Sequence, residues 1–312
     1  MSVTDSLIEV RNLRFRYGEH DVLEGVSFAV RGGEIYGLVG ADGAGKTTLL
    51  RLAAGQLTGA EGTLRVLGKD PTAPALREDI AYMPQGFGLY RDLSVLENLE
   101  FFSDLHDLSA TSAQTRIADL LQRTGLNGFE GRRAGQLSGG MMQKLALACA
   151  LVSEPRVMFL DEPTTGVDPV SRRAFWRLLE GVRADGVAIF YATANMDEAE
   201  RCNHIGLLQR GRLSMQGTPE ELLARTELNF VEITGTNARA LRERVREVDG
   251  VRLLYPVGQR LNAWLDPSLS LTGLQQRLTQ VGLQAEARRP TLHDAALYQL
   301  ATTAEHSQRD AH

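Results

Sequence analysis

The sequence predicts an α/β fold with two parts, a phosphate-loop domain over residues 1–226 and a small α+β domain over residues 227–301. Two observations predict the first domain. A glycine-rich loop lies between an apolar run and a run of helix formers, and later apolar runs alternate with helical segments. A third observation predicts the second domain, because from residue 229 the predicted segments follow the order strand, helix, strand, strand, helix, strand.

The glycine-rich loop, residues 40–48, fits the pattern G-x-x-x-x-G-K-[ST]. The apolar run Ile35–Val39 before it is predicted to be a buried strand, and residues 48–54 after it a helix. Glycines let successive N–H groups surround phosphate oxygens, and a helix N-terminus adds positive charge. A glycine-rich turn with an exposed lysine is the alternative, which the flanking strand and helix disfavour. The expected binding residues are Gly40, Asp42, Gly43, Ala44, Gly45, Lys46, Thr47 and Thr48, with Lys46 on the β- and γ-phosphates and Thr47 on Mg²⁺.

Two adjacent acids, Asp161 and Glu162, follow the apolar run 156–160, which is predicted to be a strand. The end of a neighbouring strand is where side chains can reach a phosphate loop. We therefore expect Asp161 to hold Mg²⁺, directly or through water, and Glu162 to polarise the water that attacks the γ-phosphate. A solvated acidic turn is the common alternative for an isolated Asp-Glu pair, but not beside such a loop.

A glycine turn at Ser138, Gly139 and Gly140 opens a long predicted helix. Backbone N–H groups and the Ser138 hydroxyl make it a second candidate anion site. As a four-residue match it is weak alone, because Ser-Gly-Gly is a frequent turn. A chain with two anion sites and one nucleotide can close both sites only by pairing head to tail with a second copy.

Composition narrows the function classes. The chain has 34 basic and 39 acidic residues, a net charge of −5, so it has no electrostatic footprint for nucleic acid. Cys149 and Cys202 lie far apart and are expected to be reduced core residues of a cytosolic protein. No signal peptide is visible at the N-terminus, and no run approaches the roughly 20 apolar residues that span a bilayer. Any membrane role is therefore expected to depend on a partner.

The remaining segments complete the predicted architecture. Residues 7–39 alternate between apolar and polar side chains, which predicts an antiparallel β-rich start. Ser94 and Glu97 form a predicted capping box that opens a mostly helical stretch. Further strands are expected at 64–67, 80–82 and 187–192, helices over most of 94–150, and a loop near 125–135.

The stretch from residue 229 to 300 has its own pattern, ferredoxin-like in topology. A last helix is predicted to open at Thr291, after Pro290, and the polar tail 302–312 to be disordered. No catalytic group of residues is visible there, and His293 is expected to be a packing or surface residue. The expected strands are 230–233, 251–255, 261–265 and 283–287, and the expected helix faces are Leu241, Val245 and Val248, then Leu274, Leu278 and Val281.

Together these motifs resemble the ATP-binding cassette (ABC) ATPases over residues 5–226. The resemblance implies a P-loop NTPase domain with a RecA-like core, an antiparallel β subdomain and a helical subdomain at about 86–150. It also implies that ATP is bound with Mg²⁺ and hydrolysed. Ser138, Gly139 and Gly140 would contact the γ-phosphate of the opposite subunit. Gln85 would sense Mg²⁺ and the attacking water and contact the membrane partner, Tyr17 would stack on adenine, and Asp168 would couple the two sites.

One position departs from the family pattern. Ala194 stands where these ATPases usually carry a switch histidine, in Ala192-Thr-Ala-Asn-Met-Asp-Glu-Ala-Glu200, and the next histidine, His204, is expected to lie on the surface. A methyl group cannot donate a hydrogen bond to the γ-phosphate, and such a contact typically stabilises the transition state by about 2–4 kcal/mol. The sequence therefore predicts either slow hydrolysis or pairing with a second ATPase that supplies the histidine. Asp42 stands where asparagine is commoner, and we expect little effect.

Residues 87–99, together with the appended domain and its segment 289–294, resemble the ATPases of ABC-2-type exporters, most of all bacterial multidrug-efflux ATPases that work beside a periplasmic adaptor. The resemblance implies an ABC-2-type permease as partner, a homodimer or heterodimer of ATP-binding subunits, and a place on the inner face of the cell membrane. It also implies efflux of drugs or other small molecules.

Two other functions stay open on the sequence. A soluble ABC protein of ribosomes or DNA typically has a second cassette with a basic linker or a long coiled-coil insertion, and this acidic chain has neither. A hydrolysis-impaired regulatory subunit paired with an active ATPase is kept open by Ala194.

Overall fold

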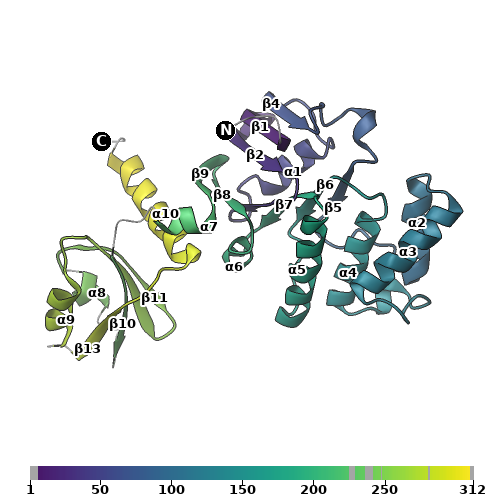
Figure 1. Ribbon diagram of the computed structural model, residues 1–312. Coiled ribbons are helices and arrows are strands. Elements are labelled where there is room, and N and C mark those ends of the chain that lie inside the picture. The colour runs from purple at the N-terminus through teal and green to yellow at the C-terminus, as the bar shows by residue number, and fades with distance from the viewer. Residues whose placement is uncertain (1–5, 225–228, 236–241, 247, 280–281, 310–312) are drawn as a thin grey trace. The chain divides into compact units, whose positions relative to one another are not determined.

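A computed structural model describes residues 6–224, 229–235, 242–246, 248–279 and 282–309. The chain divides into two compact units, Met1–Gly217 and Thr218–His312. The division falls before residue 226, where the sequence placed the domain boundary, because α7 (Pro219–Ala224) contacts α10 (Leu292–Arg309) of the second unit. Each unit is described by itself below (Figure 1).

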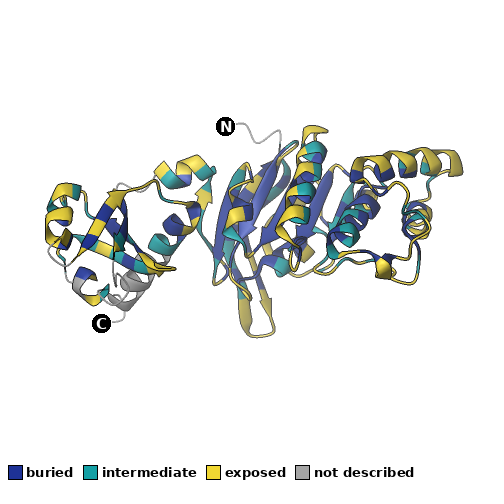
Figure 2. Ribbon diagram, turned by 90° about the horizontal axis from the view of Figure 1, so that it is seen from below, coloured by how far each residue is buried: buried dark blue, intermediate teal, exposed yellow. Residues whose placement is uncertain are grey.

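The first unit is built on a six-stranded sheet with the order β5-β6-β7-β3-β8-β9. Its strands are parallel except β9, which is antiparallel to β8. A parallel sheet covered on both faces needs continuous apolar strands, and β3 and β6 are buried at every residue. In Figure 2 the buried residues, in dark blue, gather in strands, and the exposed residues, in yellow, are frequent on helices and loops. The strands are β3 (Ile35–Val39), β5 (Ile80–Met83), β6 (Val157–Asp161), β7 (Ala188–Thr193), β8 (His204–Gln209) and β9 (Arg212–Gly217).

A second, antiparallel sheet of the first unit has the order β2-β1-β4, with β1 (Ser6–Tyr17), β2 (His20–Arg31) and β4 (Glu61–Val66). Buried side chains alternate along β2, as expected for a sheet with one face in the core. Its apolar face joins strands of the large sheet in one core, in which Phe28 stacks on Tyr36 and lies 5.0 Å from Phe190 between ring centroids. The predicted antiparallel start is confirmed.

The helices of the first unit follow the predicted pattern. The capping box is present, because the Ser94 side chain accepts from the Glu97 N–H and the Glu97 side chain accepts from the Ser94 N–H. The predicted helical stretch contains α2, α3 and α4, with non-helical residues between α3 and the short η3. The helices are α1 (Lys46–Ala53), η2 (Pro74–Leu76), α2 (Val95–Leu105), α3 (Ala110–Thr124), η3 (Ala134–Gln136), α4 (Gly139–Ala150), α5 (Pro169–Ala184) and α6 (Met196–Ala199).

The second unit contains a four-stranded antiparallel sheet with the order β11-β12-β10-β13. With helices after β10 and β12, this is the predicted ferredoxin-like topology. One face packs on α8 and α9 through Val245, Leu274 and Leu278. The elements are β10 (Asn229–Gly235), α8 (Arg242–Arg246), β11 (Val251–Val257), β12 (Arg260–Leu265), α9 (Leu271–Thr279) and β13 (Leu283–Ala287); the predicted helix-face residues Leu241 and Val281 lie outside the described residues.

The other face of this sheet packs against α10. Trp264 is fully buried, its ring lies 5.5 Å from that of Tyr298, and its indole N–H donates to the Asp294 carbonyl. The helix begins one residue after Thr291, and His293 is exposed on it. It continues to Arg309, although polar composition predicted disorder from residue 302. Side chains such as Ala, Glu and Gln are good helix formers, so polarity alone did not distinguish a helix from a disordered tail.

Candidate functional site

The predicted phosphate loop connects β3 to α1. Gly43 and Gly45 adopt left-handed φ angles of 78° and 105°, which glycine adopts at little cost. A Cβ atom at Gly40 would lie 2.5 Å from the Leu208 carbonyl oxygen, so only glycine fits there. The first residue of α1 is Lys46, and Gly45 is its N-cap without a side-chain hydrogen bond. The N–H groups of this helix end are thus left for a ligand.

Lys46 places its ammonium group within the loop. Nζ donates to the carbonyl oxygens of Gly40 at 2.8 Å and Ala41 at 3.1 Å, and it lies 3.1 Å from Oε1 of Glu162. The side chain is only 4% exposed. Asp42, on the exposed rim, has its Oδ1 4.0 Å from the same Nζ. A buried cation therefore faces the loop, with a carboxylate from another strand beside it.

Asp161, the last residue of β6, is buried and receives two hydroxyl groups. Thr47 Oγ1 donates to Oδ1 at 3.1 Å, and Tyr82 OH donates to Oδ2 at 3.2 Å. Burial raises the pKa of Asp161, an effect that the two hydroxyl donors oppose. Burial and the nearby charge of Asp161 also raise the pKa of Tyr82, so this hydroxyl keeps its proton.

Thr47 and Asp161 are chemically suited to Mg²⁺. The ion prefers oxygen ligands and is usually held by one or two carboxylates together with substrate phosphates. A hydroxyl and a carboxylate oxygen 3.1 Å apart at the mouth of the loop fit that preference. Within the described ranges, no group of three or more His, Cys, Asp or Glu side chains could hold a metal alone. Phosphate oxygens are therefore needed to complete such a site.

Glu162 follows the strand end and is held from several sides. Its backbone is left-handed, with φ at 48°, and its N–H donates to the Ala192 carbonyl oxygen at 2.9 Å. Gln85 Nε2 donates to Oε2 at 3.4 Å and Thr165 Oγ1 donates to the same oxygen at 3.3 Å. The structure thus brings Lys46, Gln85 and Glu162 together.

The second predicted anion site lies at the N-terminus of α4. Ser138 is the N-cap, and its side chain accepts from the Met141 N–H. A Cβ at Gly140 would lie 2.2 Å from Ser171 Oγ, so α4 approaches the start of α5 closely there. Asp168 caps α5, and hydrogen bonds from its first turn lower the pKa of this carboxyl group. In the described part of the chain, none of Ser138, Gly139 and Gly140 makes a hydrogen bond or ion pair with the phosphate loop.

Among the described residues, two other predicted positions, Tyr17 and Ala194, make no hydrogen bond or ion pair with the phosphate loop. Tyr17 ends β1, is 49% exposed, and packs edge-on against Phe15 with ring centroids 4.9 Å apart. Ala194 directly follows β7 and is exposed. Roles in adenine stacking and in hydrolysis remain predictions. His204 is not a simple surface residue, because its Nδ1 lies 2.5 Å from Glu34 Oε1, although the ring is 39% exposed.

Sequence reasoning missed Tyr82 and Thr165, which contact the two acids. Tyr82 was part of a predicted strand, and its register beside β6 sets its hydroxyl near Asp161. A tyrosine, whose hydroxyl can form hydrogen bonds, in the strand just before Gln85 is the feature of the sequence that could have indicated this contact. Thr165 lies three residues after Glu162, a spacing at which a threonine can bond back to the acid.

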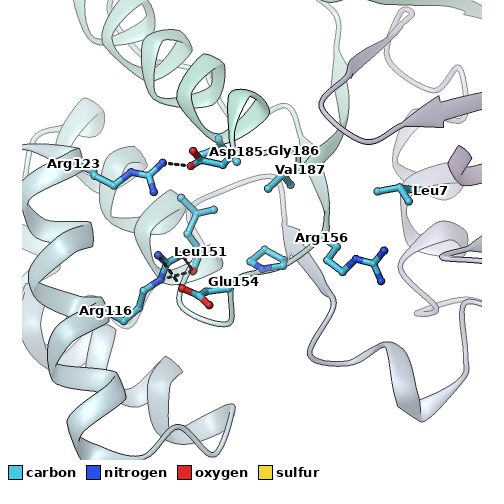
Figure 3. A pocket seen from close by; sticks show the side chains of 11 residues that line it. Leu7, Arg116, Arg123, Leu151, Glu154, Arg156, Asp185, Gly186 and Val187 are labelled. Atoms are coloured by element: carbon cyan, nitrogen blue, oxygen red, sulfur yellow. Dashed lines mark hydrogen bonds and ion pairs between the residues drawn. The ribbon is translucent and has the colours of Figure 1, made fainter. Parts of the chain in front are cut away.

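A separate cavity of about 570 Å³ in the first unit does not have the character of a phosphate site. Arginines line it, but acids and carbonyls already pair two of them (Figure 3). Arg123 Nη2 lies 2.7 Å from Asp185 Oδ2, and Arg116 contacts Glu154 at 3.3 Å and the Leu151 carbonyl at 2.8 Å. The phosphate loop is therefore a better anion site than this cavity, because it combines a helix N-terminus without a side-chain cap with the buried ammonium group of Lys46.

Comparison with known proteins agrees with this geometry. Residues 23–165 match the family model described as ABC transporter. The chain is 44% identical over 224 residues to the “Probable multidrug ABC transporter ATP-binding protein YbhF” of Escherichia coli (strain K12), covering 70% of this chain and 39% of that protein. It therefore spans about two fifths of the length of that relative.

A second relative covers nearly the whole chain. The “Daunorubicin resistance ATP-binding protein DrrA3” of Streptomyces coeruleorubidus is 33% identical over 311 residues, covering 95% of this chain and 96% of the relative. The solved structure titled “Structure of ATP binding subunit of ABC transporter” aligns with a TM-score of 0.64 and 30% identity, over 70% of this chain and 93% of that one. With a P-loop, paired acids and the ABC fold in place, the chain belongs to the ATP-binding proteins of ABC transporters.

Proposed function

We propose that this chain binds ATP with Mg²⁺ and hydrolyses it to power an ABC-2-type exporter. The observation that carries the proposal is the convergence of Lys46, Asp161 and Glu162 on the phosphate loop. A buried ammonium group, a hydroxyl–carboxylate pair and a second carboxylate are the groups that phosphoryl transfer to water requires. The family assignment supports the same activity.

The contacts suggest how these residues act. Lys46 would exchange its ion pair with Glu162 for the β- and γ-phosphates, because a phosphate carries more negative charge than one carboxylate. Glu162 would then be free to accept a proton from water, while Gln85, which already contacts it, would orient that water. Thr47 and Asp161 would hold Mg²⁺, which supplies charge neutralisation to the phosphates.

We also propose that two cassettes share each nucleotide. In the part of the chain that the structure describes, the capped helix N-terminus at Ser138 to Gly140 makes no hydrogen bond or ion pair with the phosphate loop, and Asp168 caps the neighbouring helix. A second chain placed head to tail would bring its α4 terminus to the loop of the first and complete the phosphate contacts. Tyr17, exposed at the end of β1, would offer its ring to the adenine.

A groove beside Gln85 supports docking of a membrane permease. Its volume is about 690 Å³, and its lining includes residues 82–84 and 87–90 together with Phe101, Phe102 and Leu105 of α2. The side chains of Tyr90, Phe101 and Leu105 line this groove and are 49%, 38% and 64% exposed. Single exposed apolar side chains are normal, but a group of them in one groove is typical of a binding surface. No helix in the described part of the chain is long and apolar enough to cross a membrane. We propose that a permease helix occupies this groove and holds the chain on the inner face of the membrane.

Relatives support the class of cargo. One is named for multidrug transport and another for daunorubicin resistance. We therefore propose efflux of drugs or other small molecules, through a permease that works beside a periplasmic adaptor in the wider complex.

The proposal is tested on the full chain expressed together with its ABC-2-type permease. ATP turnover by the membrane complex should fall at least about a hundredfold in Glu162→Gln, and the chain should leave the membrane fraction when Phe101 and Leu105 are changed to Glu. Unchanged turnover in Glu162→Gln would contradict the ATPase assignment. Unchanged membrane association in the double variant would contradict the docking groove.

Ala194 favours a second candidate, a hydrolysis-impaired subunit that pairs with an active ATPase. If the missing imidazole limits turnover, Ala194→His should raise kcat by about tenfold or more, since one well-placed donor is worth that much. Ala194→Leu, which adds a side chain without a hydrogen-bond donor, is the control for bulk. An equal kcat in wild type and Ala194→His would exclude this explanation and leave the active-exporter proposal.

A further inference from the structure

Glu198, in α6, is a buried carboxylate that the site described above does not use. It is only 3% exposed, and a buried charge is costly unless it is paired and hydrogen-bonded. Here the carboxylate is fully partnered. Three hydroxyls donate to it, from Thr164, Tyr191 at 2.9 Å and Thr193 at 2.8 Å, and Arg172 Nε lies 3.4 Å from Oε1, an ion-pair distance without hydrogen-bond geometry.

These partners come from segments that border the ATP site. Thr164 lies two residues after Glu162, in the loop between β6 and α5. Thr193 ends β7 and directly precedes Ala194. Arg172 lies in the first turn of α5, and its Nη2 also donates to the Val167 carbonyl at 3.3 Å. One carboxylate therefore joins the loop of the catalytic acid to the loop that carries Ala194.

The backbone at Glu162 explains why such an anchor is needed. Its φ of 48° is left-handed, which is uncommon for a residue with a side chain and also for a residue before proline, here Pro163. A strained backbone persists only where its surroundings fix it. The Glu162 N–H donates to the Ala192 carbonyl oxygen, and the Thr165 N–H donates to the Glu162 carbonyl oxygen. The bond from Thr164 to Glu198 also holds this loop.

The same carboxylate fixes the neighbouring loop. Thr193 Oγ1 donates to Glu198 Oε2 and accepts from the Asn195 N–H at 2.9 Å. Ala194 thus lies between Thr193, which carries this hydroxyl, and Asn195, whose N–H donates to it. The contact of Thr193 with Glu198 therefore reaches the backbone on both sides of Ala194.

We propose that Glu198 is a positioning residue of the ATP site, which holds Glu162 through Thr164 and the Ala194 loop through Thr193. The inference rests on the proposed ATPase function. This positioning role can be distinguished from a general stabilising role. The hydroxyls of Thr164 and Tyr191 donate to the same carboxylate, but only Thr164 lies in the loop that carries Glu162.

The test compares Thr164→Val with Tyr191→Phe in the full chain, measuring kcat and KM for ATP with Mg²⁺ and the melting temperature. Each variant removes one hydroxyl from Glu198 and also the 3.2 Å contact between the Thr164 and Tyr191 hydroxyls, so both should melt at similarly lowered temperatures. Thr164→Val should lower kcat by about tenfold or more with KM changed less than about twofold, because displacement of a catalytic group costs turnover more than binding. Tyr191→Phe should keep kcat within about twofold, and Thr164→Ser, which restores the hydroxyl, should recover it.

Equal losses of kcat in Thr164→Val and Tyr191→Phe, or an unchanged kcat in Thr164→Val, would overturn the inference. Should Thr164→Val fail to fold, Thr193→Val makes the corresponding comparison at the end of β7, beside Ala194. Glu162→Gln in the same assay separates the two proposals. If it abolishes turnover while Thr164→Val does not change it, only the positioning role fails; if Glu162→Gln keeps turnover, the proposed function fails.

Discussion

The two units use their sheets differently. In the first unit, β3, β5, β6 and β7 are parallel, so their carboxyl ends and following loops meet at one edge, where Glu162 contacts both Lys46 and Gln85. In the described part of the second unit every strand pairing is antiparallel, so strands adjacent in the sheet end at opposite edges, and helices pack on both faces. The parallel sheet therefore brings several loops together at one edge, where they can form a binding site, whereas the antiparallel sheet serves to pack the helices.

Buried polar groups show the same contrast. In the first unit, Lys46 and Asp161 face a loop whose helix N-terminus is uncapped by any side chain. In the second unit, buried acids are matched inside the fold. Asp294 accepts from Tyr255, Asn262 and Thr291, and Glu232 lies 3.1 Å from both Arg260 and Arg288. The first arrangement leaves capacity for a ligand, and the second stabilises the domain.

The largest expected effect is the loss of activity in Lys46→Ala. Removing the buried ammonium that binds transferred phosphate should lower kcat/KM for ATP about 10²–10³-fold. Arg260→Ala, which removes one of two arginines from buried Glu232, is the matched control in the other unit and should leave turnover within about twofold. The measurement is steady-state ATP turnover of the full chain. Equal losses in the two variants would break the division between a chemical unit and a packing unit.

A smaller effect, on stability alone, is expected for Asp294→Ala. The change leaves the hydroxyl of Tyr255 and the amide of Asn262 without their acceptor and loosens α10, at a cost of about 3 kcal/mol in the free energy of unfolding of the second unit. Calorimetry should show a lower transition temperature for that unit, while turnover stays near the wild-type value. His293→Ala, on the same helix but exposed, should change neither quantity. A turnover loss as large as that of Lys46→Ala would give the second unit a catalytic role.

The smallest effect is a gain of stability in Asp161→Asn. Burial raises the folded-state pKa of Asp161 above its ordinary value of 3.8. As pH rises, the unfolded chain then loses this proton first, so the stability contributed by the protonated acid is present below about pH 4 and is lost as pH rises through the folded-state pKa. At neutral pH, without nucleotide, Asp161→Asn should be more stable by about 1 kcal/mol, the low end of the cost of burying a polar group.

Melting curves of wild type and Asp161→Asn from pH 7 down to pH 4 test this sign. The stability difference should narrow as pH falls, while turnover with Mg²⁺ is lost in the variant at every pH. A difference that widens toward acid pH would mean that Asp161 is stabilised as a carboxylate in the fold, contrary to the effect of its burial.

Local patterns predicted much of this molecule. The phosphate loop, the apolar strands and the Ser94 capping box follow from residue type and spacing, and so does the strand–helix order of the second unit. Strand order did not follow, because nothing local indicates that β6 pairs with β5 and β7. The contacts of Tyr82 and Glu198 depend on that strand order. Local sequence patterns therefore did not predict the roles of these two residues, which link segments far apart in the chain. Polar composition also failed to predict the last turns of α10, because polar residues can form a helix as well as a disordered tail.

The most direct test of the account is the state of Glu162→Gln on ATP. If one chain supplies the loop and a second supplies Ser138 to Gly140, a variant that binds ATP but cannot hydrolyse it should accumulate as a closed pair. Light scattering of the full chain with ATP and Mg²⁺ should then give twice the 34.2 kDa mass of one chain, and Ser138→Arg should prevent the pair from forming. A monomer that binds ATP stoichiometrically and turns it over in wild type would contradict the shared site.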